Sequence, residues 1–147
     1  MNPDFEEMLS VLSDAEAKFL VVGAHAVAAY ATPRATGDID IWIGASTENG
    51  EKVWAALLAF GAPLEALAPD DLASEDLVFQ IGVAPSRIDI LTSIEGVVFD
   101  DAWQRREIIE VAGVNVPIIG KEDLIANKRA VGRHRDLADL EELEKGD

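Results

Sequence analysis

The hydrophobic and polar positions of this chain follow two periods, one typical of helices and the other of strands. Apolar residues three or four positions apart, and alanine-rich stretches, predict helices. Short runs rich in β-branched residues predict strands. The predicted helices cover residues 4–17, 24–31, 47–60, 99–106, 123–131 and 134–145. The predicted strands cover residues 18–22, 39–43, 77–83, 87–91, 108–111 and 114–119.

Turn and capping residues separate these elements, and their order indicates the fold class. Ser46 or Thr47 can cap the third helix, and Gly61 marks its end. The last four strands form two antiparallel pairs, which argues against a purely parallel sheet. The pattern therefore predicts an α/β or α+β domain with a mixed β-sheet flanked by helices. We expect a single domain over residues 1–147, with C-terminal helices at 121–145 packed on or beside its core.

The composition excludes several classes of protein. The chain has no cysteine, so disulfides, thiolate zinc sites and a cysteine nucleophile are excluded. Its hydrophobic fraction of 49% is typical of a globular protein. Its net charge of −16 repels a phosphate backbone, so we expect no binding to long DNA. The few basic residues are unevenly placed, and a group of them falls within residues 128–135.

The sequence also predicts where the protein resides. Residues 1–7 carry three acids and no base, unlike the start of a signal peptide. No apolar run approaches the roughly 18 residues that a membrane-spanning helix needs, so we expect no membrane partner. Together with the absence of cysteine, these features predict a cytoplasmic protein.

The strongest chemical signal is the pair of acidic residues Asp38 and Asp40, which flank Ile39 at a predicted strand. Residues two positions apart on a strand point to the same face, so the two carboxylates lie side by side. Their repulsion costs free energy unless a cation compensates it, and oxygen ligands favour Mg²⁺ or Mn²⁺. A strand face that simply points into water would also explain the pair.

A third acidic residue, Asp89, lies in a predicted strand that is otherwise apolar. A carboxylate buried there needs a partner, and we expect Arg87 to lie on the opposite face and not to serve as one. If this strand lies beside residues 39–43, three carboxylates converge, as in a two-metal phosphoryl-transfer site. Gly23, between a strand and a helix, would let a phosphate approach free backbone N–H groups. An ordinary strand–helix corner would look the same.

Together these residues resemble the nucleotidyltransferase superfamily that includes DNA polymerase β. Its pattern is an apolar strand, Gly-Ser or Gly-Gly, an Asp-x-Asp motif, and later an acid on a separate strand. This chain matches the pattern with Val22-Gly23-Ala24, Asp38-Ile39-Asp40 and Asp89. The resemblance covers about half of the chain. It implies a mixed sheet flanked by helices, and two Mg²⁺ ions that hold a nucleoside triphosphate.

The resemblance implies that Asp38, Asp40 and Asp89 are both the catalytic residues and the metal ligands. The first two would bridge both metal ions, and Asp89 would hold the catalytic metal and help to deprotonate an acceptor hydroxyl. A nucleoside monophosphate would then pass to the acceptor with release of pyrophosphate, mainly through positioning and charge neutralisation. The acceptor could be a small molecule, a protein or an RNA end.

The chain is also similar to a shorter bacterial branch of the superfamily, which includes AbiEii-type toxins. The similarity lies in residues 33–37, before the Asp-x-Asp motif, and in residues 121–128 and 133–137. By this resemblance, Lys128 and Arg133 are candidates to reach the triphosphate. A solvated helix face is the alternative.

The candidates for nucleotide binding are therefore Gly23, Ala24, Arg34, Lys128 and Arg133, with Asp136 as a residue that orients one of the last two. Ala24 departs from the pattern, because it replaces the usual Ser or Gly. The missing hydroxyl would weaken nucleotide binding, or mark a domain that has lost catalysis. Arg34 would meet a phosphate or pair with a surface acid.

Two nearby residues, His25 and Trp42, each have two interpretations, and the function has alternatives as well. His25 would lie near a phosphate or, more commonly, be a buried structural histidine. Trp42 shares the face of Asp40 and would belong to the core, the favoured interpretation, or stack on a base. The alternative function is a catalytically degenerate module that binds a nucleotide or a partner protein, as in a toxin–antitoxin pair. A third hypothesis, a plain metal-binding domain, needs no basic residues near the carboxylates.

Overall fold

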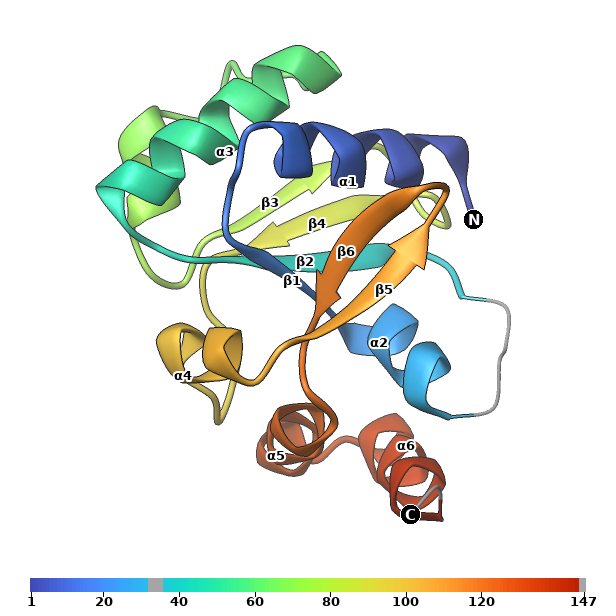
Figure 1. Ribbon diagram of the computed structural model, residues 1–147. Coiled ribbons are helices and arrows are strands. Elements are labelled where there is room, and N and C mark those ends of the chain that lie inside the picture. The colour runs from blue at the N-terminus through green and yellow to red at the C-terminus, as the bar shows by residue number, and fades with distance from the viewer. Residues whose placement is uncertain (32–35, 146–147) are drawn as a thin grey trace.

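Among residues 1–31 and 36–145, which the computed structural model describes, six strands form one mixed sheet (Figure 1). The strands are β1 (Phe19–Val22), β2 (Ile39–Ile43), β3 (Val78–Ile81), β4 (Ile88–Leu91), β5 (Glu107–Val111) and β6 (Val114–Ile118). Their order in the sheet is β3-β4-β2-β1-β6-β5. The pairs β1–β6 and β2–β4 are parallel, and the others are antiparallel. The predicted mixed sheet is confirmed.

Helices cover both faces of this sheet (Figure 1). One face carries α1 (Pro3–Asp14) and α3 (Thr47–Phe60), which pack against each other, and the 3-10 helix η1 (Pro69–Ala73) packs on α3. The helices of the other face are α2 (Gly23–Tyr30), α4 (Phe99–Gln104), α5 (Lys121–Val131) and α6 (His134–Lys145). The sheet is therefore the middle layer of three.

Alternation along the strands divides the hydrophobic core into two clusters. On β2, Ile39 and Ile41 belong to the cluster beneath α1 and α3, whereas Trp42 belongs to the cluster on the opposite face. That second cluster includes the fully buried Leu124 of α5 and Leu143 of α6. Burial of one leucine side chain stabilises a fold by about 1.5–3 kcal/mol. Packing of this kind holds the two C-terminal helices against the sheet.

The ends of the helices follow from local chemistry. Ser46 caps α3, because its hydroxyl accepts a hydrogen bond from the Asn49 N–H at 3.1 Å. Gly61 ends the same helix with φ 86°, a left-handed conformation that glycine adopts at little cost. Both predicted boundaries of α3 are confirmed.

The other predicted elements are found within the described residues, with boundaries that differ by a few positions. The strand predicted over residues 77–83 is shorter, because the chain turns at Gly82 with φ 84°. The strand that contains Asp89 lies beside β2, as the convergence of the acidic residues requires. Sequence periodicity was sufficient to locate the strands, because each strand has one or both faces in the core.

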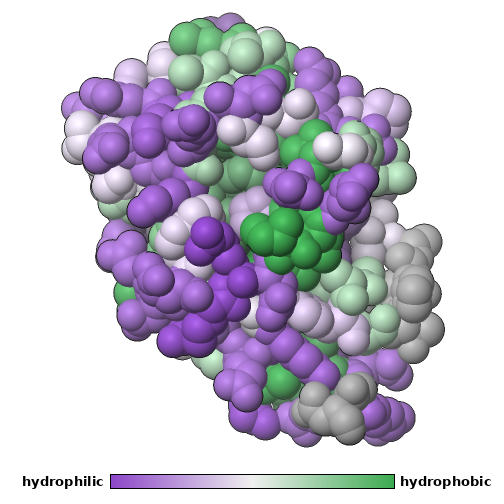
Figure 2. Space-filling model, in the orientation of Figure 1, coloured by the Kyte–Doolittle hydropathy of each residue, from purple (hydrophilic) through white to green (hydrophobic). Residues whose placement is uncertain are grey.

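The surface is mainly hydrophilic, in keeping with the net charge of −16 (Figure 2). In that view, hydrophobic atoms gather over the β5–β6 hairpin, and Ile108 of the edge strand β5 is 53% exposed. Within residues 1–31 and 36–145, every helix is too short or too polar to cross a bilayer.

Candidate functional site

Parallel pairing of β2 with β4 places two carboxylates side by side on one face of the sheet. In the register of these strands, Asp40 is the partner of Asp89. The neighbours Ile39 and Ile88 are also paired, and both point into the core on the opposite face. Asp89 is buried and Asp40 is half-buried. The acidic pair therefore combines like charge with partial exclusion from water.

The surroundings of Asp40 disfavour its charged form. Burial, and next the adjacent carboxylate of Asp89, raise the pKa of Asp40 to about 6. The positive charges of Lys128 and Arg87 act in the opposite direction but do not outweigh these causes. A cation that binds between the two carboxylates relieves the repulsion, so this position favours cation binding.

Arg87 lies against the carboxylates, which corrects the expectation that it points to the opposite face. Its Nε and Nη2 donate to the two oxygens of Asp89 at 2.7 and 3.1 Å. Its Nη2 lies 3.4 Å from Asp38 Oδ2, and its backbone N–H donates to Asp38 Oδ1 at 2.8 Å. The expectation was wrong because residues two apart on an extended chain share a face. Arg87 thus links Asp38 to Asp89.

Gly23 opens α2 directly beside Asp40. Its φ is 68°, and a Cβ atom at this position would collide with Asp40 Oδ2, so both the conformation and the space require glycine. The first turn of α2 carries no acidic side chain, and its first backbone N–H groups have no partner within the helix. These groups are suited to bind an anion next to the carboxylates.

The helices α5 and α6 contribute a network of ion pairs. Lys128 Nζ lies 3.2 Å from Asp136 Oδ1 and 3.2 Å from Asp139 Oδ2, and all three residues are buried. Arg133 donates to Asp136 Oδ2 from its Nε at 2.7 Å and from its backbone N–H at 3.1 Å. The side chain of Arg133 is 52% exposed, so its guanidinium remains open to a ligand.

Asp136 stays ionised although it is fully buried. Burial alone would raise its pKa, but hydrogen bonds from Arg133 and Lys128 outweigh that cause and lower the pKa of Asp136 to about 2. The sequence predicted that Asp136 orients one of the two basic residues. In the structure it contacts both, so one carboxylate fixes the position of two cations.

Most of these groups line one cleft of about 750 Å³, called the carboxylate cleft below, whereas Asp136 is buried behind the lining. Its size falls within the range of small-molecule sites. The predicted site residues in its lining are Gly23, Ala24, Asp38, Asp40, Asp89, Lys128 and Arg133. Arg34, the remaining one, lies outside the described residues.

The cleft also contains residues that were not selected from the sequence, among them Arg87, Asn127, Arg135 and Asp139. Arg87 and Asp89 are two positions apart, and this spacing could have predicted that both side chains lie on the same face. Asp139 follows Asp136 by three positions on a helix, which places both on one face. Asn127 and Arg135 carry no such signal, because their position depends on how α5 and α6 pack against the sheet.

His25 and Trp42 do not belong to the lining of this cleft. His25 is half-buried, and its Nε2 lies 3.1 Å from the Gly37 carbonyl oxygen and 3.0 Å from Thr36 Oγ1. It joins α2 to the segment before β2, which agrees with a structural histidine. Trp42 is buried, as favoured, and its ring meets that of Phe99 edge-on at 5.0 Å.

The chemistry of the carboxylates fits a hard divalent cation. Their side chains are not arranged around a common metal position in this structure. Within the part of the chain that the structure describes, no three acidic or histidine side chains converge as a finished metal site. Asp40 and Asp89 are adjacent, whereas Asp38 turns to Arg87. Carboxylate oxygens are the ligands that Mg²⁺ and Mn²⁺ prefer, and the repulsion at Asp40 calls for a cation. Arg87 competes with such a cation for Asp38 and Asp89.

The chain is similar to known proteins in its structure but not in its sequence. No protein-family model matches the chain, and no curated protein matches it in sequence. Its fold is similar to that of a candidate nucleotidyltransferase from Thermotoga maritima, with TM-score 0.64 and 13% identity, over 97% of this chain and 91% of the other.

Two further solved structures also share the fold. The first is the lincosamide antibiotic adenylyltransferase LnuA, solved with lincomycin, with TM-score 0.63 and 14% identity over 100% of this chain and 98% of that one. The second is the antibiotic-resistance factor ANT(2″)-Ia, with TM-score 0.57 and 15% identity over 97% and 80%. At such low identity these similarities establish a nucleotidyltransferase-like fold.

Proposed function

We propose that this protein is a nucleotidyltransferase, which transfers a nucleoside monophosphate from a nucleoside triphosphate to an acceptor hydroxyl. The observation that carries this proposal is that Asp40 and Asp89 line the same cleft as Lys128 and Arg133. Phosphoryl transfer needs two kinds of group. Carboxylates bind a divalent metal ion, and basic side chains contact the phosphate oxygens. The fold supports the proposal, since one neighbour is an adenylyltransferase.

The reaction assigns a distinct role to each side of the cleft. Asp38, Asp40 and Asp89 would hold Mg²⁺ or Mn²⁺, which when bound neutralises the triphosphate and polarises its α-phosphate. Asp89 accepts the proton of the acceptor hydroxyl, whose oxygen forms a bond to the α-phosphorus. The bond from that phosphorus to the oxygen that bridges to the β-phosphate breaks, and pyrophosphate leaves. Lys128 and Arg133 stabilise its negative charge.

The start of α2 provides the remaining phosphate contacts. The backbone N–H groups at Gly23 and Ala24 bind an oxygen of the triphosphate, and the helix N-terminus favours its negative charge. Because Ala24 has no hydroxyl, binding depends on these backbone groups and on the basic residues. Arg34 is proposed, from the sequence alone, as one more cation for the triphosphate.

A catalytically inactive module is the second candidate. The observation that favours it is the pairing of Arg87 with both Asp38 and Asp89, because this guanidinium already supplies a positive charge to the site. Such a module would bind a nucleotide or a partner protein. The narrower proposal of an AbiEii-type toxin–antitoxin component rests on the sequence of residues 33–37, 121–128 and 133–137.

Calorimetry with ATP, CTP, GTP and UTP, each with and without Mg²⁺, tests the proposal on the wild-type protein and on Asp40→Asn. We expect binding that depends on Mg²⁺ and that is lost in Asp40→Asn, because the variant removes one ligand of the cation. Glu110→Gln, on the edge strand β5, removes the same charge outside the cleft and should bind normally.

Release of pyrophosphate in the presence of an acceptor separates the two candidates. An enzyme consumes the triphosphate, whereas an inactive module binds it unchanged. If no triphosphate binds in the presence of Mg²⁺, the nucleotidyltransferase proposal is wrong, and a search for a partner protein is the next step.

A further inference from the structure

The cations of the carboxylate cleft differ in how far a carboxylate already compensates their charge. Among the described residues, the basic side chains that line the cleft are Arg87, Lys128, Arg133 and Arg135. Arg87 is paired on both sides, because its Nε lies 2.7 Å from Asp89 Oδ1 and its Nη2 lies 3.4 Å from Asp38 Oδ2. Its charge is therefore directed at the carboxylates and not at the open part of the cleft.

Lys128 and Arg133 are compensated in the same way. Lys128 Nζ lies 3.2 Å from one oxygen of Asp136 and 3.2 Å from one oxygen of Asp139. Arg133 Nε lies 2.7 Å from the other oxygen of Asp136. The charges of these two cations and two carboxylates cancel, so a phosphate that approaches Lys128 or Arg133 meets a cation that already has an anionic partner.

Arg135 differs from the other three. It is exposed in the first turn of α6, and within residues 1–31 and 36–145 it has no carboxylate partner. The next residue, Asp136, is fully buried and accepts a hydrogen bond from the Arg133 N–H at 3.1 Å, which fixes the backbone of this turn. Arg135 thus has a fixed backbone and an uncompensated guanidinium, whose planar donors match phosphate oxygens.

The start of α2 lines the same cleft as Arg135 and offers a second contact for phosphate. The first backbone N–H groups of this helix, at Gly23 and Ala24, have no partner within the helix and favour an anion. Ala24 has no hydroxyl to add to them. A side-chain contact to the outer phosphates of a triphosphate must therefore come from another element, and α6 provides one.

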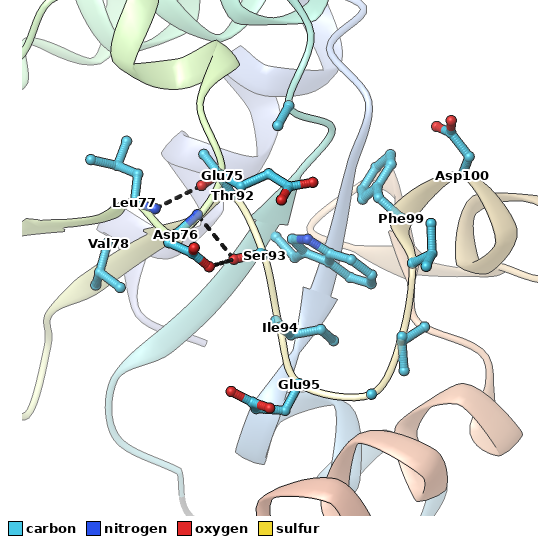
Figure 3. A pocket seen from close by; sticks show the side chains of 15 residues that line it. Glu75, Asp76, Leu77, Val78, Thr92, Ser93, Ile94, Glu95, Phe99 and Asp100 are labelled. Atoms are coloured by element: carbon cyan, nitrogen blue, oxygen red, sulfur yellow. Dashed lines mark hydrogen bonds between the residues drawn. The ribbon is translucent and has the colours of Figure 1, made fainter.

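A neighbouring pocket excludes phosphates from the other side. This pocket, of about 630 Å³, shares Ile94 and Glu95 with the carboxylate cleft. Its carboxylates are those of Glu75, Asp76, Glu95 and Asp100 (Figure 3), and among the described residues that line it there is no lysine, arginine or histidine. The negative charge of this pocket repels a phosphate chain, which therefore favours the side of the cleft where α5 and α6 meet.

We propose that Arg135 binds the terminal phosphates of the nucleoside triphosphate, and so makes the site select a triphosphate over a monophosphate. This inference rests on the proposed function, in which Asp40 and Asp89 hold the metal ion at the α-phosphate. The β- and γ-phosphates extend beyond the carboxylates, and Arg135 binds their oxygens with a charge that no described carboxylate compensates. A monophosphate lacks the groups that Arg135 contacts.

Calorimetry with inorganic tripolyphosphate and with inorganic phosphate, each with Mg²⁺, tests the role of Arg135 without a base or an acceptor. We expect Arg135→Gln to weaken the binding of tripolyphosphate about three- to tenfold, and that of phosphate by less than about twofold, since one partly exposed ion pair is lost. Arg135→Lys should recover part of the affinity, because it keeps the charge but not the planar donors.

Arg129→Gln is the matched loss of one positive charge. Arg129 belongs to α5 but does not line the cleft, and it pairs with Glu144 instead. This variant should bind tripolyphosphate nearly as well as the wild-type protein. Urea unfolding of Arg135→Gln should also match the wild-type protein, because no described carboxylate loses a partner. A marked loss of stability would assign Arg135 to the fold and overturn its binding role.

Three binding results also overturn the assignment. They are unchanged binding of tripolyphosphate in Arg135→Gln, an equal loss in Arg129→Gln, and an equal loss for phosphate. If nucleoside triphosphates bind with Mg²⁺ and Arg135→Gln binds them equally well, the proposed nucleotidyl transfer stands and only the role of Arg135 is wrong. If tripolyphosphate binds through Arg135 but no nucleoside triphosphate binds, the anion site is real and the proposed function fails. If the wild-type protein binds neither, both proposals are wrong.

Discussion

Three carboxylates of similar sequence context have different surroundings in the folded protein. Asp40 carries a raised pKa beside Asp89, while Asp38 and Asp89 are joined by the guanidinium of Arg87. The difference arises from side-chain direction on two paired strands and from a single arginine. The capacity of the site for a cation therefore depends on individual residues, and two predictions follow at this scale.

The first concerns Asp40 in the metal-free protein. Its folded pKa of about 6 lies above the unfolded value of 3.8, so the folded state holds the proton more tightly. Its contribution to stability is complete below about pH 4 and is lost as the pH rises through about 6. Asp40→Asn should therefore raise the free energy of unfolding by about 3 kcal/mol at about pH 8 and change it little at about pH 4.

Urea unfolding with a chelator present measures this difference, with Glu110→Gln as the control for loss of one acid. If Asp40→Asn lowers the free energy of unfolding at the higher pH, the carboxylate stabilises the fold and the repulsion argument is wrong.

The second concerns Arg87, which competes with a divalent cation for Asp38 and Asp89. Arg87→Met should bind Mn²⁺ about three- to tenfold more tightly without nucleotide, because the competing charge is gone. Electron paramagnetic resonance of free Mn²⁺ measures this affinity. Arg135→Met removes a positive charge from the same cleft without breaking an ion pair to the carboxylates, so it should change Mn²⁺ affinity less. Weaker Mn²⁺ binding in Arg87→Met would show that Arg87 orients the ligands instead.

Among the helices and strands, α3 is fixed to the sheet by one buried polar side chain. Asn49 Oδ1 accepts from the Lys18 N–H at 2.7 Å, and its Nδ2 donates to the carbonyl oxygens of Lys18 and Gly44 at 3.0 and 2.9 Å. Lys18 directly precedes β1, and Gly44 directly follows β2. Where these two strand ends meet, Phe19 of β1 pairs with Ile43 of β2. Asn49 therefore aligns the strand that carries Asp40 with its neighbour.

Asn49→Ala should destabilise the protein by roughly 3 kcal/mol, because several buried backbone groups lose their partner together. Ser46→Ala, which removes only the N-cap of the same helix, should cost about 1 kcal/mol. Urea unfolding of both variants gives the comparison. An equal cost for the two would mean that water replaces the amide of Asn49 and that this contact does not align the strands.

At the scale of the whole molecule, the candidate site is formed where the C-terminal helices meet the first half of the sheet. Asp38, Asp40 and Asp89 come from β2, β4 and the residue just before β2. Apart from Arg87, which precedes β4, the basic residues come from α5, α6 and the connection between them. Leu124 and Leu143 bury these helices against the sheet, and Asp136 holds the cations between them. Association of distant segments, more than any local motif, completes the cleft.

Acid should weaken this association through Asp136. Its folded pKa of about 2 lies below the unfolded value of 3.8, so its contribution is complete above about pH 4 and is lost as the pH falls to about 2. Asp136→Asn should cost roughly 3 kcal/mol at neutral pH, since two cations lose a buried partner. The cost should shrink in acid. Unfolding measured across this pH range checks both statements, and a cost that does not depend on pH would contradict them.

The sequence alone determined the order of the helices and strands, the mixed sheet and the shared face of Asp38 and Asp40. These features depend on periods of two or of three to four residues and on capping groups, which are local properties. The pairing of Arg87 with Asp89 was also readable from that period. Only the tertiary structure decided that Asp136 holds two cations, because this depends on how α5 and α6 pack. It also decided a second pocket, of about 630 Å³, whose walls come from segments before β3, after β4 and at the start of α4. Contacts between residues far apart in sequence leave no periodic trace, since they arise from the packing of whole elements.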